Sequence, residues 1–456
     1  MFTKFKEEVA SVLTQALKET GYETESDLLD QSLEESQHAD IATSISFKLA
    51  KIYKQNPKEI ANKIFNAIVI SEDSLISEKK VVGPYINFFI NREFLNKTLY
   101  NILSPQKKER KKKEKVIIEH TSANPNGPLH VGHIRNSVIG DTLARIFKKA
   151  GYDVETQYYV NDMGRQIAIV VWGLDNFEFD ESKKSDHAIA DIYIKANRVL
   201  EENPDKKNEI DTLMQKYENG DPKTIEKFEN AVNLSISGIK TTLEKMNIHH
   251  DRYIRESEFV RSGFINEVVE NIKSNGKIQI ENNALIVDLS AEGFEKGLVI
   301  QRGDGTSLYS TRDIAYHVWK ANQCHKMINI LGADHKLISS QLKAVLKIIN
   351  CTQPEIVIFE FVGLPSGSMS TRRGKFISAD ELLEEVEKQA FLEVDRRRSD
   401  MDLDFKKQVA NSVGIGAVRY DIVKVSADKA TTFDWKNALD FEKRGAPFIQ
   451  YAHARA

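Results

Sequence analysis

Residues 116–133 read Val-Ile-Ile-Glu-His-Thr-Ser-Ala-Asn-Pro-Asn-Gly-Pro-Leu-His-Val-Gly-His. The short apolar run Val116–Ile118 is typical of a buried strand. The residues 119–129 that follow are rich in Asn, Pro and Gly, which predicts a loop. Apolar positions between about Gly132 and Lys149 then predict a helix, and Gly151 is a suitable stop. A strand, a glycine-containing loop and a helix in this order open a parallel α/β unit.

The same alternation returns near the end of the chain. A helix over Asp313–Ala321, a strand over Met327–Leu331, a helix over Ile338–Ile349 and a strand over Glu355–Val362 predict the second half of a doubly wound sheet. The predicted fold class is therefore α/β, with a doubly wound parallel-sheet (Rossmann-like) domain over residues 116–378. We place an insertion at about 165–310, which is charged and helical to about residue 272 and then returns to strands.

The flanking segments have a different character. Residues 1–104 predict a separate α+β domain, in which Asn56-Pro57 begins a helix and Gly83-Pro84 interrupts a stretch of β character. Residues 105–115 form a basic linker, because positions 107–115 carry seven basic and two acidic side chains. This linker is either simply solvated or a strip that lies against a phosphate backbone. Residues 379–456 predict a helical region whose last helix has no stop signal.

Composition excludes several classes of protein. The 456 residues have a net charge of −3, so any nucleic-acid surface must be a local patch. Two cysteines, Cys324 and Cys351, can form neither a disulfide framework nor a four-thiolate zinc site. No apolar run approaches the roughly 18–20 residues that span a bilayer. We expect a cytoplasmic protein that does not enter a membrane.

The segment Pro128-Leu129-His130-Val131-Gly132-His133 carries the strongest chemical signal. It lies where the strand passes to the helix, and a helix N-terminus suits a polyphosphate. Two imidazoles three residues apart can both donate hydrogen bonds to phosphate oxygens, and Gly132 allows a flat ring to approach the backbone. The alternatives are a metal-binding pair, for which no further Cys or His cluster is evident, and two structural histidines.

Two further segments support a nucleotide site. Residues 363–375 follow a strand with small residues and end in cations, which suits a loop that closes over a triphosphate; an ordinary surface loop is the alternative. Gly332-Ala333-Asp334-His335 ends another strand. An Asp at such a position commonly binds ribose hydroxyls, although it is equally suited to cap a helix.

Together these segments resemble the class I aminoacyl-tRNA synthetases. The longer run of residues 119–136 is similar to the arginyl-tRNA synthetases in particular, as are residues 159–166, 307–313 and 450–455. The resemblance covers nearly the whole chain, and it is the combination of segments that makes it specific. It implies activation of L-arginine by ATP, with Mg²⁺ accompanying the nucleotide, and transfer of arginine to tRNA(Arg).

The resemblance also implies roles for individual residues. It assigns the HIGH-type region to Ala123, Asn124, Pro125, Asn126, Gly127, Pro128, Leu129, His130, Val131, Gly132 and His133. It assigns contacts with ATP to Pro128, Leu129, His130, Gly132, His133, Gly332, Asp334, His335 and Met369. It assigns catalytic roles to His130, His133, Met369, Ser370, Arg372 and Arg373, and it gives no residue to a metal.

The resemblance assigns the arginine pocket to Glu119, Ser122, Asn124, Tyr309, Asp313 and Gln341. Carboxylates and amide oxygens are the partners that a planar guanidinium with five donors requires. Tyr309 and Asp313 are four residues apart, so they share a face at a helix start. Without the resemblance, this pair could equally be a structural Tyr and a helix-capping Asp.

The chain departs from the family pattern in three places. Ser368 stands where the mobile loop's signature usually has Lys, and Arg372, Arg373 and Lys375 are the candidates to supply that charge. Met163 stands where many relatives have Trp. The sequence stops where the resemblance places the start of a helical anticodon-binding domain, so we expect that domain to be incomplete here.

The leading hypothesis is a monomeric arginine–tRNA ligase whose residues 1–104 contact tRNA. The alternatives are an inactive tRNA-binding or regulatory paralogue and an unrelated ATP-dependent ligase or nucleotidyltransferase on the same fold. A P-loop ATPase is excluded because the sequence has no Gly-x4-Gly-Lys-Ser/Thr segment.

Overall fold

The computed structural model describes residues 2–23, 26–93, 96, 99–100, 114–363, 378–440 and 445–455. The chain divides into two compact units, Met1–Glu109 and Arg110–Ala456. The predicted boundary at residue 104 and most of the predicted basic linker lie outside the described residues. No helix among the described residues is long and apolar enough to cross a membrane.

The first unit is an α+β unit with its own core. Its helices are α1 (Phe2–Thr20), α2 (Ser26–Asp30), α3 (Ile45–Tyr53) and α4 (Pro57–Ala67). Its strands are β1 (Leu33–Glu34), β2 (Ile41–Thr43), β3 (Ile76–Val82) and β4 (Tyr85–Ile90), which form an antiparallel sheet in the order β1-β2-β4-β3. As predicted, the Asn56 side chain caps α4 by accepting from Lys58 N at 2.9 Å. Gly83, with a φ of 61°, makes the predicted turn between β3 and β4.

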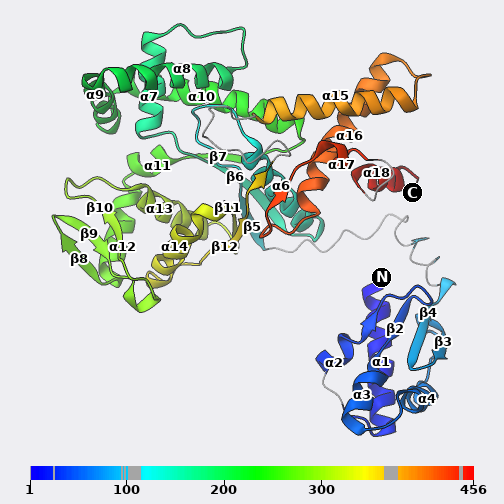
Figure 1. The fold of residues 1–456 in the computed structure, drawn as a ribbon. Helices are drawn as coiled ribbons and strands as arrows, with labels where there is room; N and C mark the ends of the chain where they lie inside the picture. Colours follow the sequence, from blue (N-terminus) through cyan, green and yellow to red (C-terminus); the bar gives the residue numbers. More distant parts are fainter. Residues whose placement is uncertain are drawn as a thin grey trace. The chain divides into compact units, whose positions relative to one another are not determined.

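The second unit is built on a five-stranded parallel sheet in the order β12-β11-β5-β6-β7 (Figure 1). The strands are β5 (Lys115–Glu119), β6 (Asp153–Val160), β7 (Arg252–Arg255), β11 (Lys326–Gly332) and β12 (Glu355–Phe359). The chain winds outward from β5 through β6 to β7, and on the other side through β11 to β12. This confirms the doubly wound α/β fold.

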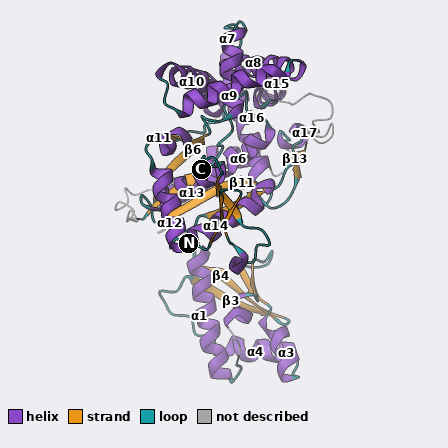
Figure 2. Ribbon diagram, turned by 90° about the vertical axis from the view of Figure 1, so that its left-hand side faces the viewer, coloured by secondary structure: helices purple, strands orange, loops and turns teal. Residues whose placement is uncertain are grey.

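Helices surround this sheet (Figure 2). The sequence motif of two histidines begins α6 (Val131–Lys149), which follows β5 as predicted. The second half of the sheet brings α13 (Tyr309–Ala321), the short η3 (Ala333–His335) and α14 (Lys336–Ile348). The extent of α13 differs from the prediction, because the helix begins at Tyr309 and not at Asp313.

The insertion consists of two parts. Between β6 and β7 lie α7 (Arg165–Asn176), α8 (Ser185–Glu202), η1 (Pro204–Lys206), α9 (Lys207–Glu218) and α10 (Pro222–Lys245). Between β7 and α13 lie α11 (Glu256–Arg261), α12 (Phe264–Asn275), η2 (Ser290–Glu292) and the antiparallel strands β8 (Ile278–Glu281), β9 (Ala284–Val287) and β10 (Leu298–Gln301).

One strand of the main sheet therefore lies inside the span predicted to be a single insertion. β7 pairs in parallel with β6, and its four residues are Arg-Tyr-Ile-Arg. Such a short and partly charged segment lacks the apolar run that marks a buried strand. Only its position against β6 identifies it as part of the sheet.

The C-terminal part contains α15 (Ala379–Arg397), α16 (Leu403–Val423), α17 (Trp435–Ala438) and α18 (Ala446–Arg455). The sequence predicted a region that is helical throughout, and this is wrong at one point. There β14 (Thr431–Thr432) pairs in parallel with β13 (Val362–Gly363). Two-residue strands have no sequence period to detect. The pairing joins the segment after β12 to the segment after α16.

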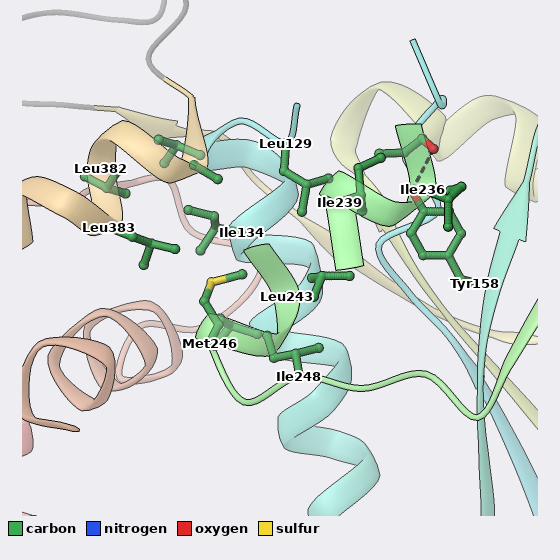
Figure 3. Packing of buried hydrophobic residues seen from close by; sticks show 14 of the residues in the cluster. Leu129, Ile134, Tyr158, Ile236, Ile239, Leu243, Met246, Ile248, Leu382 and Leu383 are labelled. Carbon is green, nitrogen blue, oxygen red and sulfur yellow. Dashed lines mark hydrogen bonds between the residues drawn. The ribbon is translucent and has the colours of Figure 1, made fainter. Parts of the chain in front are cut away.

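Apolar packing ties the insertion to the histidine helix. Figure 3 shows Ile239 and Leu243 of α10 near Leu129, which precedes α6, and Ile134 in the first turn of α6. Leu382 and Leu383 of α15 belong to the same buried cluster (Figure 3). The cluster therefore holds α10 and α15 against the N-terminal end of α6, which is the end that carries the two histidines.

Candidate active site

A cavity of about 1110 Å³ opens where β5 and β11 end, between the two halves of the sheet. Ligands of doubly wound sheets bind at this position, because the loops on either side diverge. The loop after β5, the start of α6, the end of β11 and the β13–β14 pair form its walls. Of the residues predicted from the sequence, the cavity is lined by Glu119, Ser122, Ala123, Asn124, His130, Gly132, His133, Gly332, Asp334 and His335.

Other predicted residues lie outside this lining. They are Pro125, Asn126, Gly127, Pro128, Leu129 and Val131 of the HIGH-type region, and Tyr309, Asp313 and Gln341 of the predicted arginine pocket. Leu129 is fully buried, and its carbonyl accepts a hydrogen bond from Ala379 N at 2.7 Å. Met369, Ser370, Arg372 and Arg373 lie outside the described residues, as do Ser368 and Lys375, so their roles stay predictions.

The two histidines cap the helix that they begin. His130 Nδ1 accepts from the backbone nitrogens of Gly132 and His133 at 3.1 and 3.4 Å, and His133 Nδ1 accepts from His130 N at 3.3 Å. The rings stack with their centroids 3.6 Å apart. Because both Nδ1 atoms accept, each neutral ring carries its proton on Nε2. Both rings are therefore oriented as Nε2–H donors.

Burial keeps both imidazoles neutral. It lowers the pKa of His130, against a backbone hydrogen bond that acts to raise it. It also lowers the pKa of His133 to about 3, with a further contribution from the neighbouring His130. Two uncharged donors at a helix N-terminus suit an anion whose charge is spread over several oxygens.

A strained loop carries the next residues into the cavity. Thr121 and Ser122 have φ angles of 70° and 41°, a region that residues other than Gly seldom occupy. Asn136 of α6 supports this backbone, since its Oδ1 accepts from Thr121 N at 2.6 Å and its Nδ2 donates to Ile330 O at 2.9 Å. Ser122 Oγ in turn accepts from Tyr159 N at 3.0 Å. The loop is thus fastened to β11, β6 and α6.

Glu119 is the carboxylate at the end of β5. It is 7% exposed, and its Oε2 accepts from the ammonium of the fully buried Lys320 at 2.7 Å. Its Oε1 lies 3.5 Å from Ser122 Oγ. The carboxylate therefore stands at the cavity wall with a buried cation behind it.

Tyr309 is the first residue of α13 and is 61% exposed. Asp313 lies one turn further along the helix, and its side chain is 36% exposed. Burial acts to raise the pKa of Asp313, but His317 and Lys320 oppose this and hold it below its usual value. The carboxylate thus stays ionised at neutral pH. Gln341 lies partly buried on α14.

A second carboxylate stands close to Asp313. Glu256 begins α11, is 3% exposed and accepts from Arg312 Nη1 at 2.7 Å. Burial raises its pKa and Arg312 opposes this, while Asp162 and Asp313 add to the rise. Burial raises the pKa of Tyr159, and Glu256 and Asp313 add to this rise. Among the described residues, the buried Tyr159 Oη has no hydrogen-bond partner. A cation at this place would meet several oxygen acceptors.

At the other side of the cavity, β11 ends in Gly332 and leads into η3. Asp334 is 65% exposed there and lies 3.6 Å from His335 Nε2. A side chain at position 332 would collide with Asp334, because a Cβ would lie 2.6 Å from its Oδ1. Glycine at this position lets the carboxylate fold over the strand end.

The histidine pair does not belong to a metal cluster within the described ranges. In the described part of the chain, the acidic and histidine side chains whose ligand atoms lie close enough together to hold a metal ion are Asp186, His187 and Asp380. Lys184 Nζ already occupies that cluster, at 2.5 Å from Asp380 Oδ2 and 3.1 Å from Asp186 Oδ2. An internal ammonium thus balances these carboxylates.

Sequence reasoning missed several residues of the site. Asn136 follows His133 by one helical turn, so helix periodicity was a signal for it. Lys320 follows Asp313 by seven residues, again on one face of the same helix. Glu256, Thr431 and Thr432 had no local signal, because other segments of the chain bring them to the site.

Comparison with known proteins shows the family of the chain. Residues 96–435 match the family described as tRNA synthetases class I (R), catalytic domain, and residues 6–90 match the arginyl tRNA synthetase N terminal domain. The chain is 57% identical to an arginine–tRNA ligase of Methanococcoides burtonii and 56% identical to one of Methanosarcina mazei. Each alignment covers 100% of this chain and 80% of the relative.

Solved structures agree as well. An arginyl-tRNA synthetase of Thermus thermophilus superposes with a TM-score of 0.77 at 26% identity, over 99% of this chain and 80% of the other. An arginyl-tRNA synthetase of Plasmodium falciparum, at 17% identity and a TM-score of 0.72, shares the fold. With both family matches and relatives above 50% identity, the chain belongs to the arginyl-tRNA synthetase family of class I tRNA synthetases.

Proposed function

We propose that this protein activates L-arginine with ATP and transfers it to tRNA(Arg), giving arginyl-tRNA, AMP and diphosphate. The observation that carries the proposal is the shared cavity, in which Glu119, Ser122 and Asn124 stand beside His130 and His133. Carboxylate and amide groups suit the cationic amino acid, and the histidine pair suits the nucleotide phosphates. Family membership supports the same activity.

The first step joins the two substrates directly. An oxygen of the arginine carboxylate attacks the α-phosphorus of ATP in line, and the bond to diphosphate breaks. No covalent bond to the enzyme is required, so the protein acts by positioning and electrostatics. The Nε2–H groups of His130 and His133 donate to phosphate oxygens as negative charge moves onto the diphosphate.

Other residues position the nucleotide. Gly132 leaves room for adenine against the backbone, while Gly332 and Asp334 bind the ribose and His335 adds to that contact. Pro128, Leu129 and the loop residues Met369, Ser370, Arg372 and Arg373 complete the ATP site. Mg²⁺ would arrive with ATP as part of the nucleotide substrate and would supply positive charge that stabilises the phosphates.

The arginine side chain extends away from the phosphates. Its guanidinium binds Asp313 and Tyr309, with Gln341 nearby, while Glu119, Ser122 and Asn124 hold the α-carbon end next to ATP. In the second step a ribose hydroxyl at the 3′ end of tRNA attacks the activated carbonyl and releases AMP. Residues 1–104 contact the tRNA, and the enzyme works as a monomer in the cytoplasm.

The test is aminoacylation of total tRNA with each of the twenty amino acids. We expect charging with arginine and no other amino acid. Charging with a different amino acid would overturn the substrate assignment. Tight tRNA binding without charging by any amino acid would favour the alternative of an inactive, tRNA-binding paralogue.

A further inference from the structure

The two carboxylates that hold arginine in the proposed function are joined behind the pocket by one buried polar network. At one end Lys320 Nζ donates to Glu119 Oε2 at 2.7 Å. At the other end His317 Nδ1 lies 3.2 Å from Asp313 Oδ1 and 2.8 Å from the Asp313 carbonyl oxygen. The network thus begins and ends on groups that face the substrate.

The middle of the network is continuous. Lys320 Nζ lies 3.2 Å from His317 Nε2 and donates to Asn329 Oδ1 at 3.2 Å. Asn329 Nδ2 donates to His317 Nε2 at 2.7 Å. Because an ammonium can only donate, His317 Nε2 must accept, and the proton of the ring lies on Nδ1, where it can donate to Asp313. Each polar atom of the network therefore has a fixed role as donor or acceptor, so the hydrogen bonds have a single arrangement.

Burial makes this arrangement rigid. Lys320 and His317 are fully buried and Asn329 is 2% exposed. The Lys320 ammonium also stands 4.0 Å above the ring of Tyr316. Its members come from three elements, with Glu119 on β5, Asn329 on β11, and Asp313, His317 and Lys320 on one face of α13. Side-chain contacts therefore lock the distance between a strand end and a helix start.

Stability alone is a weak reason for such a network. A buried ion pair is often no more stabilising than well-packed apolar side chains of the same volume, although removal of one partner is costly. What a satisfied buried network does provide is a single, well-ordered geometry. The geometry kept here is the relative position of Glu119 and Asp313.

The separation of Glu119 and Asp313 determines how long an amino acid must be to contact both carboxylates. Glu119 lines the cavity beside the histidines, and Asp313 lies outside the lining. Because the substrate carboxylate must reach the α-phosphate, its α-ammonium lies toward Glu119 and its guanidinium toward Asp313. We propose that His317, Asn329 and Lys320 are positioning residues that fix the separation of Glu119 and Asp313, and so select amino acids by the distance between their two cationic groups. The inference rests on the proposed function.

The experiment compares three substrates that differ by one methylene. They are arginine, the longer homoarginine and the shorter 2-amino-4-guanidinobutyrate, and kcat/KM for charging is measured with each. In the His317→Asn variant the new amide can still reach Asp313, but the contact with Lys320 is lost. The Lys320→Met variant removes the cation at the centre of the network. For both variants we expect the preference for arginine over each analogue to fall at least about fivefold, since misplacement of a reacting group by about 1 Å can cost 10²-fold.

Tyr316→Phe is the matched control. Tyr316 lies on the same helix and is fully buried, but its hydroxyl donates to Gln157 Oε1 at 2.8 Å and not to a substrate-facing carboxylate. We expect this variant to lose stability while its preference for arginine stays as in the wild type. If Lys320→Met does not fold, His317→Asn carries the test alone.

The outcomes separate the two proposals. An equal loss of kcat/KM for all three substrates in His317→Asn would show a merely structural network and overturn the inference, with the proposed function intact. A similar loss of preference in Tyr316→Phe would also overturn it. Failure of the wild-type protein to charge arginine would overturn the proposed function and this inference together.

Discussion

At the scale of single residues, backbone amides decide the chemistry of the histidine pair. The amides at the start of α6 occupy both Nδ1 atoms, so Nε2 is the donor of each ring. A motif usually described by its residue types therefore also specifies a tautomer. The helix that the histidines begin is what imposes it.

This arrangement predicts different results for two substitutions of His133. The Gln amide can reach the place of Nε2, whereas the Asn amide reaches only the place of Nδ1. We expect His133→Asn to lower kcat of arginine activation by about 10²-fold, as loss of a transition-state donor does, and His133→Gln to lower it less. The measurement is kcat beside the KM for ATP. Recovery of activity on added Zn²⁺ would point to a metal pair instead.

A second pair of histidines is formed by the buried His120, which precedes Ser122 in the sequence, and the half-buried His250, which contacts His120; their ring centroids lie 4.2 Å apart. Burial, with help from His250, lowers the pKa of His120 well below its usual value. Burial also lowers the pKa of His250 to about 4, although the His120 backbone and nearby carboxylates oppose the shift. Between pH 6.5 and 4 the unfolded chain therefore binds protons that the folded chain does not.

The free energy of unfolding should consequently fall as the pH drops below 6.5. Each such histidine adds a slope of up to about 1.4 kcal/mol per pH unit. We expect His250→Gln to reduce the loss between pH 7.5 and 5.5 by about 1 kcal/mol, measured by urea unfolding. The exposed neighbour His249→Gln is the control. Identical pH dependence in the wild type and His250→Gln would contradict the assignment.

At the scale of elements, α15 is held at its first turn. Ser378 caps the helix and pairs with His130, and Ala379 N donates to Leu129 O. The next residue, Asp380, accepts from Lys184 at 2.5 Å and from Thr242 at 3.1 Å, and lies 3.0 Å from His187 Nε2. Burial acts to raise its pKa, but Lys184 and His187 hold it below the usual value. Side chains at the start of α8 and on α10 thus fasten α15 beside His130.

We expect Asp380→Asn to lower the free energy of unfolding by about 1–3 kcal/mol, because it removes one of the two carboxylates that pair with the Lys184 ammonium. It should also lower kcat, since His130 loses its support. The control is Asp191→Asn, which removes the exposed ion pair between Asp191 of α8 and Lys183 and should cost at most about 1 kcal/mol. Urea unfolding and charging rates are measured for both. Equal effects of the two substitutions would show that the Asp380 cluster has no special role.

At the scale of the whole molecule, the protein consists of two units with separate cores. Phe5, Ile45, Ile64 and Phe88 belong to a cluster confined to the first unit. The cavity and the residues proposed to bind arginine all belong to the second. Binding of the small substrates and binding of tRNA can therefore be separated.

We expect the fragment 110–456 to keep the intact chain's affinities for arginine and ATP but to bind tRNA more weakly. In the proposed function the first unit binds the tRNA backbone, so its removal should also make the salt dependence of binding less steep. Equilibrium binding of tRNA(Arg) at two salt concentrations tests this, with arginine affinity as the control. Unchanged tRNA affinity would remove the first unit from tRNA recognition.

Much of the fold follows from the sequence alone. The strand, loop and helix around His130, the second half of the sheet and the α+β character of the first unit are all confirmed. These features depend on hydrophobic period, caps and turn residues, which act over a few neighbouring residues. Part of the cavity wall, including Ser122, His130 and His133, was predicted through a motif that is contiguous along the chain.

Tertiary structure alone decided the rest. It placed β7 in the main sheet, paired β14 with β13, and connected Glu119 to Asp313 through Lys320. Each of these depends on residues that are far apart in sequence and have no local pattern. A buried Lys and an exposed Lys look alike in a sequence, because their difference lies in the partners that the fold brings to them.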